Sequence, residues 1–137
     1  MTAALRILCV DDEPDIRELV AMALAIDPAL DVRLAGSGSE ALAMLDDRAW
    51  TPDIALIDLM MAGMTGTDLM AAIRTRPKGR DLPIIFMTAS NWQSGSERYM
   101  LAGALGLIGK PFDPMTLAQT IRDYWSQVRR NDRVPNA

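Results

Sequence analysis

The chain has 137 residues, of which half are hydrophobic and 23% are charged, a composition typical of one folded domain with a packed core. Eighteen acidic residues against fourteen basic ones give a net charge of −4, which argues against a protein that wraps a nucleic-acid backbone. There is no histidine. This excludes catalysis by Ser-His-Asp or Cys-His sets, zinc sites that use His, and a role as a phosphohistidine donor.

The sequence predicts neither a targeting segment nor a membrane-spanning one. Residues 1–6 lack a basic region followed by an apolar one. The longest apolar runs, such as residues 19–26, are far shorter than the roughly 20 residues that cross a bilayer. The only cysteine, Cys9, excludes an intramolecular disulfide and fits a reducing compartment. We therefore expect a cytoplasmic protein without membrane insertion.

Short apolar runs alternate with longer amphipathic runs along the chain. The short runs predict buried strands at residues 5–10, 31–35, 53–57, 83–87 and 104–108. The longer runs predict helices at about 14–25, 38–49 and 94–102, one that carries Leu69, Met70 and Ile73 after a loop at 59–66, and one from 113 onward. Five repeats of strand and helix imply a parallel sheet with helices on both faces and leave no second domain. We expect residues 128–137 to form a frayed polar tail.

Polar side chains follow four of these strands. In an open parallel sheet, ligands bind beyond the carboxyl ends of the strands. The residues at those ends are Asp11, Asp12 and Glu13 after the first strand, Asp58 after the third, Thr88 after the fourth and Lys110 after the fifth. Clustered carboxylates repel one another and persist only with a cation or with raised pKa values. Mg²⁺, a hard divalent ion that prefers oxygen ligands, is therefore the expected occupant.

This set of side chains suits phosphoryl transfer. A carboxylate beside Mg²⁺ can act as a nucleophile toward phosphorus and form an aspartyl phosphate. Lys110 would supply a point charge, and Thr88 a hydrogen-bond donor, for the equatorial oxygens of the phosphoryl group. The chain has twelve Arg but only two Lys, Lys78 and Lys110, which favours a specific role for the ammonium at position 110.

With these residues in this order, the chain resembles the receiver domain of bacterial two-component response regulators, in the single-domain form typified by the chemotaxis regulators. The resemblance covers roughly residues 5–127 and implies an α/β, flavodoxin-like, five-stranded parallel sheet of order 2-1-3-4-5. It implies that Asp58 is the phosphoacceptor, that Thr88 is the switch hydroxyl, and that Lys110 and Pro111 form a Lys-Pro signature joined by a cis peptide.

The resemblance also implies a metal site and partners. Mg²⁺ would be held by Asp12, Asp58 and the main-chain carbonyl of Met60, with Asp11 acting mostly through water. A sensor histidine kinase or a histidine phosphotransfer protein would donate the phosphoryl group, and a downstream protein would receive the signal. The domain would catalyse this transfer and its own slow dephosphorylation without being an enzyme in the usual sense. No direct contact with nucleic acid is expected.

The sequence departs from the family pattern at two positions. Ala62 stands where the family usually has Pro, which predicts a less rigid loop. Leu107 stands three residues before Lys110, where the family usually has the Tyr or Phe that turns inward when the Thr moves toward the phosphoryl group. The site chemistry is unaffected, but the output must use another side chain, with Met100 and Trp92 as candidates.

Two other functions fit parts of the sequence. A phosphorylation-independent binding module of the same fold, a pseudo-receiver, is suggested by Leu107, although the intact acidic pair argues against it. A Mg²⁺-dependent phosphohydrolase similar to the haloacid dehalogenase family would need a second Asp two residues after the first. Asp58 is followed by Leu59 and Met60, so that carboxylate is missing.

Several residues have simpler structural interpretations. We expect Glu13 to be a helix N-cap residue rather than a metal ligand. Residues 36–41 fit a dinucleotide-binding pattern, but Ser37 and Glu40 also form a capping box, which is the commoner reason for such a sequence. Cys9 is expected in the core. Met60, Met61 and Met64 lie beside the phosphoacceptor, where they would gate access to it, whereas Trp92, Tyr99 and Trp125 fit either the core or a partner surface.

Overall fold

The structure is a computed structural model that describes residues 4–89, 99 and 102–133. Its strands are β1 (Leu5–Val10), β2 (Leu30–Ala35), β3 (Ile54–Asp58), β4 (Ile84–Ala89) and β5 (Gly106–Lys110). Its helices are α1 (Pro14–Leu24), α2 (Gly38–Asp46), α3 (Gly66–Arg74) and α5 (Leu117–Arg133), with a short 3₁₀ turn, η1 (Pro77–Gly79). The helix expected at residues 94–102 falls almost wholly outside the described residues.

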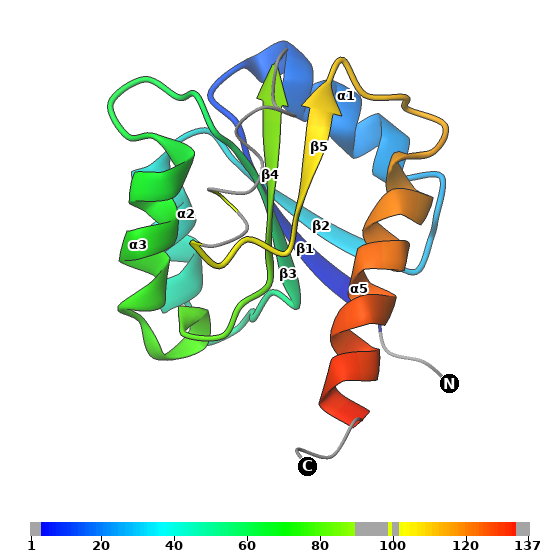
Figure 1. The fold of residues 1–137 in the computed structure, drawn as a ribbon. Coiled ribbons are helices and arrows are strands. Elements are labelled where there is room, and N and C mark those ends of the chain that lie inside the picture. The colour runs from blue at the N-terminus through cyan, green and yellow to red at the C-terminus, as the bar shows by residue number, and fades with distance from the viewer. Residues whose placement is uncertain (1–3, 90–98, 100–101, 134–137) are drawn as a thin grey trace.

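The five strands form one parallel sheet in the order β2-β1-β3-β4-β5, which confirms the predicted fold. Helices α1 and α5 cover one face of the sheet, and α2 and α3 cover the other (Figure 1). All strands point the same way, so their carboxyl ends share one edge. The order reverses between β1 and β3, and at such a point the loops diverge and leave room for a ligand.

Alternate residues of the strands supply two cores. In β3 all five residues are buried, as expected for a strand covered on both faces. Ala55 and Ile57 pack toward α2 and α3, while Ile54 and Leu56 pack toward α1 and α5. Burial of this strand on both sides fixes the position of Asp58 at its end.

The strands β4 and β5 extend further than the sequence predicted. Thr88 pairs with Gly109 and Ala89 with Lys110 in the parallel ladder, so both strands reach the polar residues at their ends. Hydrophobicity marks the buried part of a strand, whereas the ladder hydrogen bonds continue into the half-exposed part. Thr88 and Lys110 are therefore held by the sheet itself rather than by loops.

Three helix ends also differ from the predicted ones. α5 begins at Leu117, not at residue 113, because the Asp113 side chain accepts the Met115 N–H at 2.9 Å and a turn precedes the helix. It continues to Arg133, so residues 128–133 are helical and not part of a frayed tail. α2 ends at Asp46, because Asp47 is extended and its carboxylate accepts the Ala49 N–H at 2.9 Å. None of the helices described in the structure is long and apolar enough to cross a membrane.

Candidate functional site

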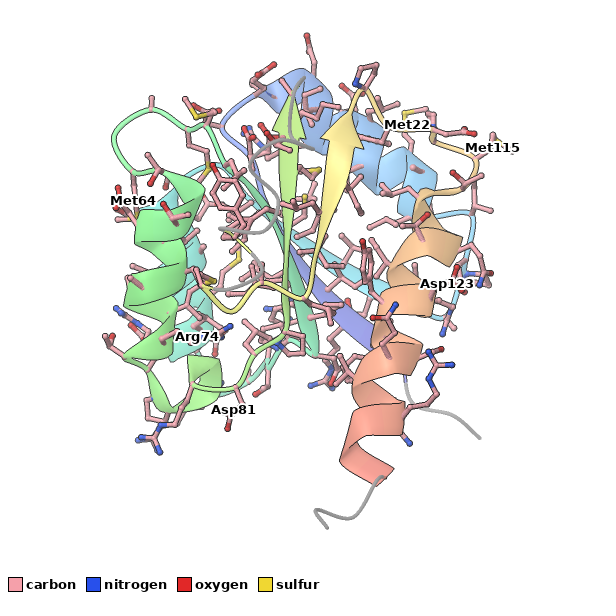
Figure 2. The ribbon with its side chains drawn as sticks, viewed as in Figure 1. Met22, Met64, Arg74, Asp81, Met115 and Asp123 are labelled. Atoms are coloured by element: carbon pink, nitrogen blue, oxygen red, sulfur yellow. The ribbon has the colours of Figure 1, made fainter. Side chains whose placement is uncertain are left out.

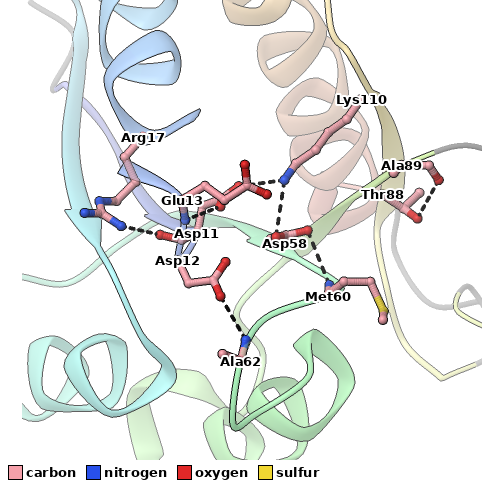
Figure 3. Close-up of polar contacts among 10 residues, drawn as sticks. All are labelled: Asp11, Asp12, Glu13, Arg17, Asp58, Met60, Ala62, Thr88, Ala89 and Lys110. Atoms are coloured by element: carbon pink, nitrogen blue, oxygen red, sulfur yellow. Dashed lines mark hydrogen bonds and ion pairs between the residues drawn. The ribbon is translucent and has the colours of Figure 1, made fainter. Parts of the chain in front are cut away.

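Asp11, Asp58 and Lys110 meet at the carboxyl edge of the sheet (Figure 3). The Lys110 Nζ lies 2.8 Å from Asp11 Oδ2 and 3.2 Å from Asp58 Oδ2. Asp11 is 0% exposed and Asp58 is 3% exposed, so two carboxylates share one ammonium in a setting largely removed from water. The peptide bond from Lys110 to Pro111 is cis, as the resemblance implied.

Burial and charge change the proton affinity of these groups. Burial raises the pKa of Asp58, and the negative charge of Asp11 raises it further, against the opposing effect of Lys110. For Lys110, burial favours the neutral amine, but the hydrogen bonds and charges of Asp11 and Asp58 together outweigh it and raise the pKa. One ammonium therefore does not fully compensate the carboxylates, and the site favours an additional cation.

Asp12 and Glu13 add two carboxylates next to this pair. Asp12 Oδ2 accepts the Ala62 N–H at 2.9 Å. Proline at position 62 would have no N–H to donate, so the residue expected to loosen this loop instead ties it to Asp12. Glu13 holds the N-cap position of α1, as expected, but its side chain makes no capping hydrogen bond. Its carboxylate lies with those of Asp11 and Asp12, and the ligand atoms of the three residues lie within 4.8 Å of one another.

This donor set fits Mg²⁺. The ion prefers oxygen ligands and keeps several waters, so a few carboxylates at one edge of a sheet suffice. Asp11 belongs to both groups of acidic side chains: it shares the Lys110 ammonium with Asp58, and its carboxylate lies close to those of Asp12 and Glu13. Of these residues, Glu13 is the one that the sequence predicted to be a helix N-cap residue rather than a metal ligand.

Thr88 lies at the end of β4, at the edge expected, but its hydroxyl does not point to Asp58. It donates to the carbonyl of Ala89 at 3.2 Å (Figure 3). The expected contact with a phosphoryl oxygen therefore requires this side chain to rotate. Rotation about χ1 of a threonine is a move between staggered positions and breaks one weak hydrogen bond.

The segment between Asp58 and α3 is fixed at both ends. The Met60 N–H donates to Asp58 Oδ1 at 3.3 Å, and the Met60 side chain is 74% exposed. At the other end, Thr65 and Asp68 form a full capping box at the start of α3. The sequence analysis missed this box, although the Thr-x-x-Asp pattern that signals it is present. At residues 37–40, only the Ser37 half forms, with its hydroxyl accepting the Glu40 N–H at 3.1 Å.

Leu107 and Tyr99 occupy the core beside the Thr88 strand. Leu107 is 8% exposed and belongs to the core on the α2 and α3 face. Tyr99 packs against that core, and its ring meets Phe86 edge-on at 5.9 Å between centroids. Met100 and Trp92, the residues suggested as replacements for the missing aromatic, lie outside the described residues. Trp125 packs against the other core, on the α1 and α5 face.

A surface cavity of about 230 Å³ lies far from these carboxylates. It is lined by Leu45, Asp46, Arg48, Arg76, Pro77 and Lys78. Two of the three cations that line it have partners within the chain: the Arg76 Nε pairs with Asp46 at 3.1 Å, and the Lys78 Nζ donates to the carbonyls of Asp47 and Trp50. Arg74 and Asp81 mark the same end of the molecule (Figure 2). The cavity therefore lies at one end of the domain, and the acidic side chains with Lys110 lie at the opposite edge of the sheet.

The comparisons with known proteins agree with this geometry. The sequence matches the family model of the response regulator receiver domain over residues 7–122. The chain belongs to this family. Receiver domains are signalling switches of two-component systems, they work with histidine kinases, and they generally bind Mg²⁺ at an acidic pocket.

Individual relatives cover different shares of their own length. The DNA-binding response regulator MtrA of Mycolicibacterium smegmatis is 33% identical over 130 residues, which are 95% of this chain and 53% of MtrA. The chain thus spans about half the length of MtrA. An uncharacterized 14.6 kDa protein of Leptolyngbya boryana is 33% identical over 122 residues, 89% of this chain and 91% of that protein. The structure of the chemotaxis response regulator CheY4 of Vibrio cholerae is similar with a TM-score of 0.78 at 32% identity, over 90% of this chain and 99% of CheY4.

Proposed function

We propose that this receiver domain accepts a phosphoryl group on Asp58 from the phosphohistidine of a sensor kinase or a histidine phosphotransfer protein, in a reaction that requires Mg²⁺. The observation that carries the proposal is the position of Lys110 between Asp11 and Asp58, at 2.8 and 3.2 Å, on a buried edge of the sheet. A lone Asp at a strand end is common. Two buried carboxylates that share one ammonium lower the stability of the fold, and such arrangements are found mostly at functional sites.

The transfer is an in-line displacement at phosphorus. A carboxylate oxygen of Asp58 forms the new P–O bond as the P–N bond to the donor imidazole breaks, and the electron pair stays with the imidazole, which leaves as neutral histidine after taking up a proton. Lys110 keeps its position beside Asp58 and neutralises charge on a phosphoryl oxygen. Thr88, once rotated away from the Ala89 carbonyl, donates its hydroxyl to another.

Asp12, Asp58 and the Met60 carbonyl would hold Mg²⁺, with Asp11 acting mostly through water. Asp11 is already bonded to Lys110, which supports this indirect role. The bound ion supplies positive charge that compensates the carboxylates and the incoming phosphoryl oxygens. The Met60 side chain is 74% exposed, and it is the main-chain carbonyl of this residue that would bind the ion.

Phosphorylation changes the charge around Lys110 and Thr88, and the strands β4 and β5 carry that change outward. Because Leu107 has no ring or hydroxyl, its response is limited to repacking against neighbours such as Phe86. The output is a protein–protein contact with a downstream target. We propose that this reaction takes place in the cytoplasm, a reducing compartment that the single cysteine of the chain fits.

Intact mass after incubation with acetyl phosphate tests the proposal. We expect one added phosphoryl group on the wild type with Mg²⁺, none without Mg²⁺, and none on Asp58→Asn. Asp81→Asn is the matched control, because Asp81 is exposed at the opposite edge of the sheet (Figure 2). It should label as the wild type does. Label that persists in Asp58→Asn would contradict the assignment of the phosphoacceptor.

The second candidate is the phosphorylation-independent binding module. It is favoured by Leu107 in place of the aromatic and by a Thr88 hydroxyl that faces Ala89. This function would be established instead if acetyl phosphate does not label the wild type and if tryptophan fluorescence detects no binding of Mg²⁺.

A further inference from the structure

Arg17 lies beside the acidic site without belonging to it. It stands one turn into α1, where its N–H donates to the Glu13 carbonyl at 3.1 Å. Its side chain turns back toward the sheet, and the Arg17 Nη1 donates to the main-chain carbonyl of Asp11 at 2.7 Å (Figure 3). The guanidinium therefore joins the start of α1 to the end of β1, the segment that carries Asp11, Asp12 and Glu13.

Gly36 makes room for this guanidinium. A Cβ at position 36 would lie 3.1 Å from Arg17 Nη1, 3.3 Å from Cζ and 3.6 Å from Nη2. The guanidinium therefore lies next to the space that a side chain at position 36 would occupy. A Cβ at Gly36 would push the guanidinium by a few tenths of an ångström, and we expect the larger side chain of Val to move it further from the Asp11 carbonyl.

Arg17 completes the hydrogen bonding of Asp11. The Asp11 N–H donates to the Ala35 carbonyl at 3.1 Å, Oδ1 accepts the Glu13 N–H at 2.9 Å, and Oδ2 accepts from Lys110 at 2.8 Å. The main-chain carbonyl is the remaining polar group, and Arg17 takes it. With every polar group engaged, Asp11 has one orientation, and the chain direction into Asp12 is set with it.

We propose that Arg17 is a positioning residue for the metal site: seated on Gly36, it fixes the main chain at Asp11 so that the Asp11 and Asp12 carboxylates stand ready for Mg²⁺. The inference rests on the proposed function, because it assigns a role toward the ion that the phosphoryl transfer requires. Arg17 touches neither the ion nor the phosphoryl group. It acts through Asp11.

Positioning and simple electrostatics predict opposite signs. Arg17 is a cation next to an acidic cluster, so if charge alone mattered, its removal would lower the repulsion toward Mg²⁺ and tighten binding. If Arg17 orders the ligands, its removal leaves them free and weakens binding. Loss of an outer partner of a metal ligand costs about tenfold or more in metal affinity, which exceeds the effect of one partly exposed charge.

The experiment is a Mg²⁺ titration of the full chain, followed by NMR at the amides of Glu13 and Ala62, which donate to Asp11 and Asp12. Arg17→Met removes both the charge and the bond. Gly36→Val keeps the charge and displaces the guanidinium. We expect about tenfold weaker Mg²⁺ binding in both variants. Gly36→Ala, with only a Cβ, should give a smaller loss in the same direction.

Arg74→Met is the matched control. Arg74 also bonds main-chain carbonyls, those of Gly79 at 2.9 Å and Leu82 at 2.7 Å, but at the opposite end of the molecule (Figure 2). Thermal unfolding without Mg²⁺ measures what each substitution costs the fold. We expect Arg74→Met to lower the melting temperature and leave the Mg²⁺ affinity unchanged.

Each outcome separates the two proposals. Unchanged affinity in Arg17→Met and Gly36→Val, or tighter binding in Arg17→Met, overturns the positioning role while the phosphoacceptor proposal stands. A wild type that binds no Mg²⁺ overturns the proposed function, and this inference with it. Arg74→Met losing affinity as much as Arg17→Met would show a general loss of fold and would likewise overturn the positioning role.

Discussion

Asp11 and Lys110 form an ion pair of 2.8 Å, although 99 positions separate them in the sequence. Asp11 follows β1 and Lys110 ends β5, and two other strands, β3 and β4, lie between β1 and β5 in the sheet. The lysine side chain therefore crosses the ends of both strands to reach its partner. The pair therefore forms only when β1, β3, β4 and β5 lie side by side in the sheet.

Lys110→Met should destabilise the domain at neutral pH. Its removal leaves two buried carboxylates without a counter-charge, and breaking a buried pair in this way costs about 3 kcal/mol. In the wild type, the folded state raises the pKa of Lys110 above its ordinary value of 10.5. The stability that the Lys110 ammonium contributes is therefore fully present below pH 10.5 and is lost only as the pH rises through the raised pKa. Urea unfolding across pH measures both effects.

Lys78→Met is the control for this variant. Lys78 is the other lysine of the chain, and its partners are the Asp47 and Trp50 carbonyls rather than carboxylates. Acid or Mg²⁺ should narrow the difference in stability between Lys110→Met and the wild type, and should leave the difference between Lys78→Met and the wild type unchanged. Equal recovery of the two variants would show that charge balance at the site is not the cause.

Asp58→Asn should raise the melting temperature by a few degrees at neutral pH without Mg²⁺. Burial raises the pKa of Asp58, so the folded protein binds this proton more tightly than the unfolded chain. Ionised Asp58 thus costs stability, and the cost sets in as the pH rises through the ordinary value of 3.8 toward the raised one. The gain of the Asn variant should vanish below pH 3.8, where the wild-type carboxyl is protonated in both states. Calorimetry of both proteins across pH tests this sign, and a lower melting temperature for Asp58→Asn would contradict it.

Gly66→Ala should impair the site without touching its chemistry. A Cβ at Gly66 would lie 2.7 Å from the Asp58 carbonyl oxygen and 2.9 Å from Leu59 Cα, so α3 must move away from β3. We expect slower labelling by acetyl phosphate and a loss of stability. Gly63→Ala is the comparison: Gly63 has φ +81° and open space around it, so the cost is about 1 kcal/mol of backbone strain. Labelling of Gly66→Ala at the wild-type rate would show that the approach of α3 does not set the position of Asp58.

Gly106 and Tyr124 should show energetic coupling. A Cβ at Gly106 would lie 2.3 Å from the Tyr124 ring, and the Tyr124 hydroxyl donates to the Leu107 carbonyl at 3.3 Å. Tyr124→Phe should cost about 1 kcal/mol for the lost hydrogen bond. Gly106→Ala should lower the free energy of unfolding by more than this in the wild-type background. In the Tyr124→Ala background, which has no ring at this place, the same substitution should cost much less. If the effects of Gly106→Ala and Tyr124→Ala on the free energy of unfolding simply add in the double mutant, the two residues are not in contact.

The fold was predictable because burial leaves a direct mark on sequence. Ile54–Asp58 is buried on both faces and apolar up to its last residue, so a covered parallel strand was the only simple interpretation. The strand ends were not predictable in the same way. Ala89 and Lys110 join the ladder through main-chain hydrogen bonds, which every residue type except proline can make.

The site was predictable in its membership and less so in its contacts. Strand direction brings Asp11, Asp58 and Lys110 to one edge whatever their side chains do. The direction of the Thr88 hydroxyl depends on a local choice of rotamer, and no sequence pattern encodes it. Arg17 was missed because its partner is a main-chain carbonyl, which has no residue-type signal. Glu13 was placed at the right helix position, but its carboxylate makes no capping hydrogen bond, and the pattern of residue types does not show this.

The sole cysteine of the chain has a practical consequence for observing this switch. Cys9 is 0% exposed, and burial together with the charge of Asp11 raises its pKa to about 12. The thiolate is the reactive form, so this thiol is inert toward maleimides and peroxide at neutral pH. A cysteine introduced on the surface will thus take a fluorophore or spin label alone. The native cysteine therefore does not need to be removed first.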